Sequence, residues 1–89
     1  MKAIVTVIGK DKVGITANVC MLLAQNNINI LDITQTVLQD YFTMVMLVDT
    51  QGLNDSYHAL KEALAKLGED MELSIRIQHE DIFQAMHRV

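Results

Sequence analysis

The chain has 89 residues with a formal net charge of −4, and 51% of its residues are hydrophobic. This length predicts one domain over residues 1–89 with one modest core, and the acidic balance argues against a nucleic-acid binder, which needs a basic surface to neutralise phosphates. The single cysteine, Cys20, excludes an internal disulfide and favours a reducing cytoplasm, and the apolar run over residues 3–8 is too short for a signal peptide or a membrane span.

The first predicted elements are a strand and a helix. Residues 3–8 are rich in β-branched side chains and apolar on both alternations, which predicts a central strand covered on both faces. Apolar side chains then recur at helical spacing and predict a helix over residues 15–25. Asn26 and Asn27 are expected to end this helix, because asparagine tolerates the left-handed conformation at a helix C-terminus.

A hairpin is predicted next. Residues 29–39 and 42–48 form its strands and residues 40–41 its turn, without the Asn-Gly signal of a tight hairpin. Strict alternation places the side chains of the first of these strands on two faces, with Leu31, Ile33 and Val37 on one and Ile30, Asp32, Thr34 and Thr36 on the other.

The last predicted elements are a second helix and a fourth strand. Asn54 or Asp55 is expected to cap the helix, and Gly68 to end it. Residues 73–78 then alternate apolar and polar, which predicts a half-buried strand in a more exposed position of the sheet. Residues 80–89 form a short amphipathic C-terminal segment. The helix itself is predicted from the spacing of Leu60, Leu64 and Leu67.

The order of elements, β-α-β-β-α-β, indicates an α+β fold. Because β-α-β crossovers are right-handed almost without exception, the simplest arrangement is a ferredoxin-like sandwich, a four-stranded antiparallel sheet with two helices on one face. Two helices on one face leave apolar residues of the strands at 3–8 and 42–48 exposed on the other face. We therefore expect a homo-oligomer, in the first instance a two-fold homodimer, that covers the open face or the sheet edge.

The turn over residues 9–15, between the first strand and the first helix, is the strongest candidate for a site. Two glycines and an aspartate in seven residues mark a tight strand-to-helix turn. Such a turn aims the first, unpaired N–H groups of the helix outward. These donors, with the positive end of the helix dipole, suit a carboxylate or a phosphate, so the sequence predicts a small-ligand site here.

Three stretches of the chain resemble the ACT domain family: residues 9–15 with their D-x-x-G-I pattern, residues 27–30, and residues 41–44. The resemblance covers nearly the whole chain, up to about His79. The chain is similar to small standalone ACT proteins of bacteria, and then to the ACT segments of glycine-cleavage regulators and of formyltetrahydrofolate deformylase. The resemblance implies regulatory binding of a small molecule, usually an amino acid, at an interface between two ACT domains, with a separate effector protein to receive the signal.

The same resemblance nominates ligand-binding residues on two subunits. In that family the ligand contacts the backbone of the first turn in one subunit, and the start of the second strand in the partner closes the site. Many members have proline where Val13 stands, and valine either loosens the turn or offers one more N–H donor. Carried over to this sequence, the first group is Asp11, Val13, Gly14, Ile15 and Thr16, and the second group is Asn29 and Ile30.

Three of these residues also have a purely structural interpretation. Gly14 permits a backbone angle that other residues avoid, whether or not a ligand approaches it. Asp11 either caps the helix, which is the favoured interpretation, or orients a ligand amine. Asn29 either closes the site or ends the preceding loop.

Other functions fit the residues less well. No Ser/His/Asp or Cys/His set stands out, and an acylphosphatase on this fold would need an arginine in the first turn, where only lysines stand, so we expect no enzyme and no cofactor. An RNA-binding sheet would need paired aromatic residues in basic surroundings. His79, Glu80, Asp81 and His87 match no common metal-ligand spacing. A dimerisation or protein-interaction module without a ligand stays open as the alternative.

Overall fold

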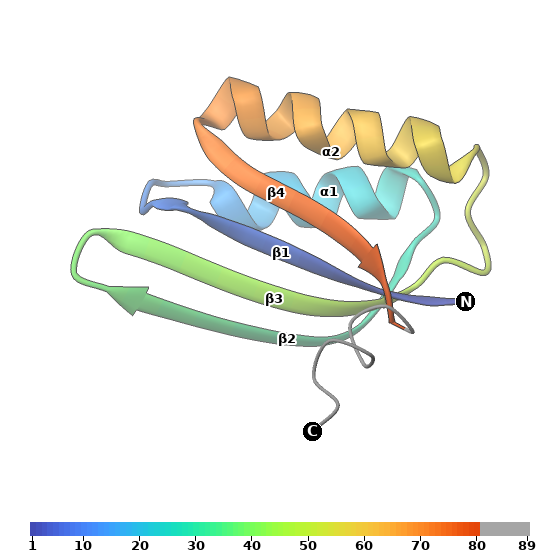
Figure 1. The fold of residues 1–89 in the computed structure, drawn as a ribbon, viewed down its shortest axis with the longest axis horizontal. Coiled ribbons are helices and arrows are strands. Elements are labelled where there is room, and N and C mark those ends of the chain that lie inside the picture. The colour runs from blue at the N-terminus through green and yellow to red at the C-terminus, as the bar shows by residue number, and fades with distance from the viewer. Residues whose placement is uncertain (81–89) are drawn as a thin grey trace.

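The computed structural model describes residues 1–80, and it confirms the predicted order of elements and the ferredoxin-like fold (Figure 1). Apart from Glu80, the predicted C-terminal segment over residues 80–89 lies outside the described residues. The elements are β1 (Lys2–Lys10), α1 (Ile15–Gln25), β2 (Asn29–Leu38), β3 (Tyr41–Asp49), α2 (Tyr57–Met71) and β4 (Leu73–His79).

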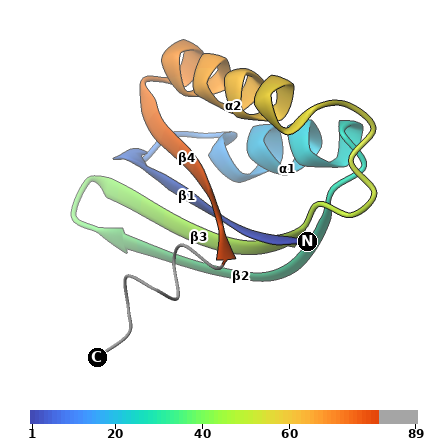
Figure 2. The same ribbon diagram turned by 45° about the vertical axis from the view of Figure 1, so that its right-hand side comes forward.

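The four strands form one antiparallel sheet in the order β2-β3-β1-β4, and both helices lie on the same face of it (Figure 2). The central strands are β1 and β3, as their apolar sequences predict, and β4 is an edge strand, as its alternation predicts. The second edge strand is β2. Within residues 1–80 the sheet therefore has two free edges, one on each side of the β1–β3 pair.

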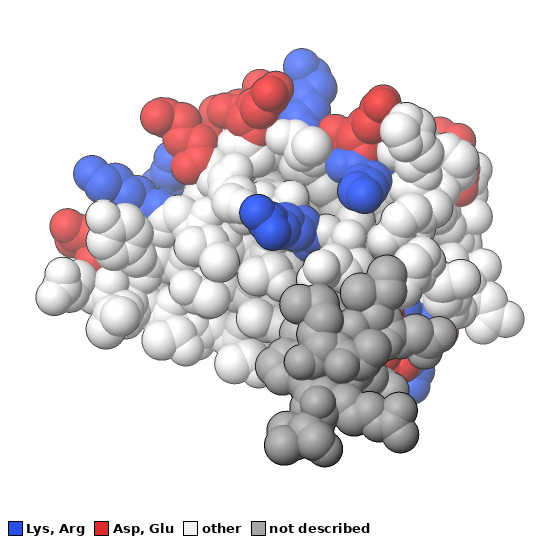
Figure 3. Space-filling view, viewed as in Figure 1, with Lys and Arg blue, Asp and Glu red and all other residues white. Residues whose placement is uncertain are grey.

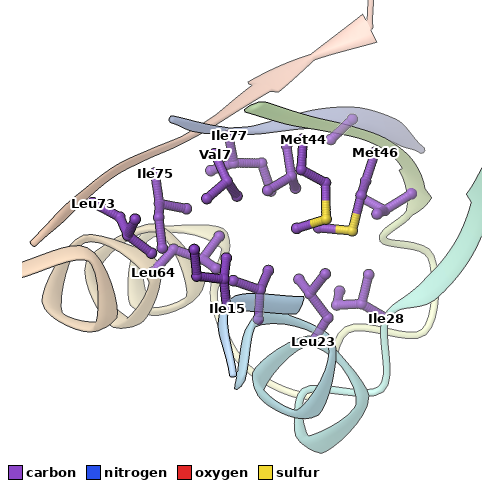
Figure 4. Packing of buried hydrophobic residues seen from close by; sticks show 14 of the residues in the cluster. Val7, Ile15, Leu23, Ile28, Met44, Met46, Leu64, Leu73, Ile75 and Ile77 are labelled. Atoms are coloured by element: carbon purple, nitrogen blue, oxygen red, sulfur yellow. The ribbon is translucent and has the colours of Figure 1, made fainter. Parts of the chain in front are cut away.

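The core lies between the sheet and the helices (Figure 4). Alternate side chains of the two central strands, among them Val7 and Met46, point to the helices and are fully buried. Leu23 of α1 and Leu64 of α2 meet them from the other layer. Each fully buried aliphatic side chain contributes about 1.5 to 3 kcal/mol, so this layer supplies most of the stability.

The start and the end of α1 are set by two residues in the left-handed region. Gly14 is the N-cap, with φ of 92°, which a residue with a Cβ rarely adopts. At the other end Asn27 has φ of 60°, which confirms the predicted role of asparagine there. The Asn27 side chain also donates from Nδ2 to the carbonyl oxygen of Gly52 at 2.8 Å, which ties the end of α1 to the loop after β3.

The hairpin differs from its prediction in two places. Its turn is Gln39–Asp40, because Leu38 pairs with Tyr41, so the predicted turn over residues 40–41 is wrong by one residue. The register of β2 shifts at Leu31, since Ile30 pairs with Val48 but Asp32 pairs with Leu47. The β-bulge at this point turns Ile30 to the helix side of the sheet, the same side as Ile33 and Val37. Strict alternation, which put Ile30 on the other face, is wrong there.

Both predicted boundaries of α2 are also wrong. The hydroxyl of Ser56 caps the helix by accepting from the N–H of Ala59 at 3.0 Å, so neither Asn54 nor Asp55 is the cap. Gly68 lies inside the helix, is buried, and faces the backbone of Leu73 at the start of β4. The helix continues to Met71 and ends at Glu72, which has φ of 58°.

Removing the observed cap should cost stability, and removing the predicted cap should not. We expect Ser56→Ala to lower the free energy of unfolding by about 1 kcal/mol, because the Ala59 N–H loses its acceptor. Asn54→Ala should change the free energy of unfolding by no more than about 0.5 kcal/mol, as for an ordinary exposed position. Urea denaturation of both variants measures the difference, and equal losses would contradict the assignment of Ser56.

Candidate functional site

The turn between β1 and α1, residues 11–14, is held from two sides. The N–H of Asp11 donates to the carbonyl oxygen of Asp40 at 2.7 Å, which ties it to the hairpin. The ammonium group of Lys12 donates to the carbonyl oxygen of Met71 in the last turn of α2. A cation at this position also interacts favourably with the negative end of the helix dipole. The turn is thus anchored at its start, before α1 begins.

The N-terminus of α1 itself has no cap from a side chain and no acidic residue in its first turn. Among residues 1–80, the backbone amides of Val13, Gly14, Ile15 and Thr16 have no acceptor. These are the orphan donors expected at a helix start, and here they remain unpaired. Four adjacent N–H groups at the positive end of a helix form the part of the turn that suits an anion.

The structure corrects the favoured interpretation of Asp11. Its side chain does not cap α1, because Gly14 is the N-cap and no side chain accepts a hydrogen bond from the amides of the first turn. Instead, Asn18 donates to the carbonyl oxygen of Gly14 from its backbone at 2.9 Å and from Nδ2 at 2.7 Å. The side chain of Asp11 is exposed and stays available for another role. For Gly14 the structural interpretation is confirmed by its positive φ.

Two other nominated residues have side chains with internal roles. Ile15 is 2% exposed and belongs to the core, so only its amide can serve a ligand. The hydroxyl of Thr16 lies 3.2 Å from Oε1 of Gln35, and this contact joins the first turn of α1 to the middle of β2. Sequence patterns gave no sign of that contact. The ligand-facing groups of this turn are therefore backbone groups, as the resemblance implies.

The second nominated group lies at the other end of the sheet. Asn29 pairs with Asp49 at one end of β3, whereas the turn is bonded to Asp40 beside the other end. Nine residues of β3 at about 3.4 Å per residue place the two ends roughly 27 Å apart. One chain therefore does not bring the two nominated groups together.

An ionised carboxylate lies beside Asn29. The N–H of Gln51 donates to Oδ1 of Asp49 at 3.0 Å, and the N-terminal ammonium group lies 3.4 Å from the same oxygen. The Gln51 N–H is the main cause that holds the pKa of the Asp49 carboxyl below its ordinary value, and the N-terminal ammonium adds to it. The start of β2 thus carries acceptor oxygens, in contrast to the donors of the turn.

Within residues 1–80, the outer edge of β2 has no pairing strand, and it carries exposed aliphatic side chains. The N–H of Thr50 donates to the carbonyl oxygen of Met1, which lies on the β1 side of β3. Backbone groups along a strand point alternately to its two sides, so those of Val45 point toward β2, where Thr34 pairs with Val45. The backbone groups of Ile33, Gln35 and Val37 then point outward. The helix layer leaves this strand uncovered, and exposure reaches 39% for Ile33, 54% for Val37 and 72% for Leu38.

Within residues 1–80, no group of three or more His, Cys, Asp or Glu side chains is placed to hold a metal ion. No helix in the same range is long and apolar enough to cross a membrane. Of the four residues whose spacing matched no metal-ligand pattern in the sequence, Asp81 and His87 lie outside the described residues.

Comparison with known proteins places this geometry in a family. A UPF0237 protein of Clostridium acetobutylicum is 54% identical over 89 residues, 100% of each chain. The structure of an ACT domain protein from Streptococcus pneumoniae is 42% identical, with a TM-score of 0.81 over 94% of each chain. The sequence model of the ACT domain matches residues 2–78.

Two larger proteins contain a similar unit, so only part of each is matched. A formyltetrahydrofolate deformylase from Pseudomonas syringae is 26% identical with a TM-score of 0.76, over 88% of this chain and 27% of that one. The regulatory subunit of aspartate kinase from Thermus thermophilus is 25% identical with a TM-score of 0.65, over 86% of this chain and 50% of that one. The fold, the match of the family model to residues 2–78 and the relative that is 54% identical over the full length lead to one conclusion: the chain belongs to the ACT domain family of small regulatory domains.

Proposed function

We propose that this chain binds a small carboxylate metabolite, an amino acid in the first instance, at an interface between two copies of itself. The observation that carries the proposal is the row of unpaired amides over residues 13–16, on a turn that is anchored from both sides. A carboxylate accepts hydrogen bonds from such a row, and the dipole of α1 adds to the attraction. Membership of the ACT family and the likeness to a regulatory kinase subunit support a regulatory role.

A second copy related by two-fold symmetry would bring residues 29–30 of one chain close to residues 11–16 of the other. If the free edges of two β2 strands pair antiparallel, the start of one strand lies beside the end of the other. The end of β2 adjoins the turn through the hydrogen bond between Asp11 and Asp40. Asn29 and Ile30 of the partner would then approach the unpaired amides. Donors from one copy and acceptors from the other suit the two ends of a zwitterion.

The alternative is a dimerisation or protein-interaction module with no ligand. The apolar edge of β2 supports it, because an exposed edge with large aliphatic side chains is enough to drive association. Both functions use the same dimer. They differ only in whether the amides of residues 13–16 receive a ligand.

Thermal denaturation with each of the twenty amino acids separates the two functions. An amino acid at one hundred times its dissociation constant should stabilise the folded dimer by about 2.7 kcal/mol. The Asn29→Ala variant should weaken binding about tenfold, roughly 1.4 kcal/mol, without loss of the fold, because the Asn29 side chain has no hydrogen-bond partner within residues 1–80. Thr34→Ala, on the same strand, is the matched control.

Gly14 is a poor probe for this test, because any side chain there is strained at φ of 92° and its effect on binding would be confounded. A dimer whose melting temperature no amino acid changes would reject ligand binding and leave the interaction module. An amino acid that binds Asn29→Ala and wild type equally would reject the part assigned to the start of β2.

A further inference from the structure

The second free edge of the sheet, on β4, lies under α2 and forms a groove of about 300 Å³. Figure 3 shows this side of the molecule, where basic side chains stand on an uncharged central surface and acidic side chains lie along its upper margin. The groove is lined by Lys61 and Ala65 of α2 and by Ile75, Arg76, Ile77 and Gln78 of β4.

The backbone of β4 points into this groove at every second residue. The hydroxyl of Tyr57 donates to the carbonyl oxygen of Ile77 at 3.4 Å, from the side of α2. Residues of β4 that face outward therefore include Ile77 and, by alternation, Ile75, whereas Arg76 bonds with Thr6 of β1. The carbonyl of Ile75 and the N–H of Ile77 are left for a partner in the groove, whereas α2 lies over the N–H of Ile75, whose nitrogen would stand 3.6 Å from a Cβ on Gly68.

Both ends of this free backbone are closed. At one end the ring of Tyr57 stacks on His79, with 4.5 Å between ring centroids. At the other end α2 packs directly on β4, and a Cβ on Gly68 would stand 2.7 Å from the carbonyl oxygen of Leu73. The groove thus accommodates a short extended segment and excludes a long strand.

The charges beside the groove are positive and lack acidic partners. Lys61 and Arg76 are exposed on its two walls, and neither forms a salt bridge within residues 1–80. Tyr57 and Ala65 lie four residues before and after Lys61 on the helix, and both are uncharged. No ion pair with either of them therefore neutralises the charge of Lys61. In a chain with net charge −4, two unpaired cations beside an unpaired edge are complementary to carboxylates.

From these observations we infer that the β4 groove binds a short, extended, acidic segment of a partner protein, which adds to the sheet as a fifth strand. The backbone of Ile75 and Ile77 supplies the strand hydrogen bonds, and Lys61 and Arg76 select acidic side chains. This site lies at the opposite edge from β2, so a β2-paired dimer keeps both of its grooves available. The inference is independent of whether an amino acid binds at the turn.

The test uses a fluorescent five-residue peptide of alternating threonine and glutamate, measured by anisotropy with the full chain. We expect saturable binding, no binding of the peptide with lysine in place of glutamate, and at least a tenfold loss when the peptide backbone is N-methylated at alternate residues. The double variant Lys61→Glu with Arg76→Glu should lose at least tenfold. Lys66→Glu, an exposed lysine of α2 outside the groove, should bind as wild type does.

Amide NMR spectra locate the peptide. Slower hydrogen exchange at Ile77 is the expected result. Exchange slowed at Ile33 and Val37 instead, equal binding of the lysine peptide, or no saturation at 1 mM peptide would each overturn the inference. Free glutamate that displaces the peptide at equal concentration would also overturn it, because the groove would then be a site for small anions. None of these outcomes depends on the amino-acid screen.

Discussion

Val37→Lys is expected to separate the β2-paired dimer into folded monomers. Val37 is 54% exposed in one chain. It lies on the helix side of the edge strand β2, at a point that the helices do not cover. In a two-fold dimer each substitution acts twice, removing two apolar contacts and placing two cations at one interface. Edge lysines are a common device against strand pairing. With about 1.5 to 3 kcal/mol for each buried aliphatic side chain, the dissociation constant of the dimer should rise at least about a hundredfold.

Sedimentation velocity across micromolar concentrations measures this change, and circular dichroism checks that the monomer is folded. Ser74→Lys, at the other edge of the sheet, is the matched control and should leave the dimer intact. A wild-type chain that sediments as a monomer at these concentrations would reject the dimer itself. A Val37→Lys variant that still dimerises would place the interface elsewhere, on the open face of the sheet.

A pair of proline substitutions tests the strand edge directly. The N–H of Gln35 points outward, so Gln35→Pro should remove the pairing between chains and keep the fold. Thr34 bonds inward to β3, so Thr34→Pro should break the internal ladder and lower the free energy of unfolding by about 3 kcal/mol. Equal unfolding of both variants would mean that the outward direction assigned to Gln35 is wrong.

Gly68→Ala is the second change with a large expected effect, and its sign distinguishes two roles for the glycine. In an unobstructed helix interior, alanine stabilises by roughly 0.5 to 1 kcal/mol relative to glycine. Here the added Cβ would stand 2.7 Å from the carbonyl oxygen of Leu73, a backbone atom that cannot rotate away. Overpacking of this kind costs about 1 to 3 kcal/mol, so the clash outweighs the gain in propensity.

We therefore expect Gly68→Ala to lower the free energy of unfolding by about 1 to 2 kcal/mol, or the melting temperature by roughly 5 to 15 °C. Ala65→Gly, three residues earlier on the exposed side of the same helix, should destabilise by about 1 kcal/mol through propensity alone. Helix propensity by itself predicts that Gly68→Ala raises the free energy of unfolding and that Ala65→Gly lowers it. A more stable Gly68→Ala variant would show that β4 can move away from α2 at no cost.

Regular patterns in the sequence were enough to predict the fold. A β-branched run located β1, a run that is apolar on both sides located β3, and helical spacing located α1. The order of the elements then led to the sheet topology. The errors lie where tertiary contacts override local signals. Gly68 resembles a helix end, but it is a close contact with the next strand. Three polar residues precede α2, and only the geometry of the loop selects Ser56 among them.

The candidate site shows the same division. The glycine-containing turn could be recognised from its residue types, and its amides are unpaired as expected. The partners that position it could not be recognised, because Asp40 and Met71 meet the turn only after the whole sheet has formed. The β-bulge at Leu31 could not be predicted either, because an alternating sequence does not show where a strand contains one extra residue.

The difference between the two edge strands bears on how far assembly can proceed. A sheet with two similar edges could join head to tail, one edge of each molecule on the other edge of the next, and such contacts grow into open fibrils. Here the β2 edge carries exposed aliphatic side chains and a single charged residue, Asp32, whereas the β4 edge is short and cationic and is closed at its two ends by the Tyr57–His79 stack and by α2. If only like edges pair, assembly would therefore stop at the two-fold dimer that we propose.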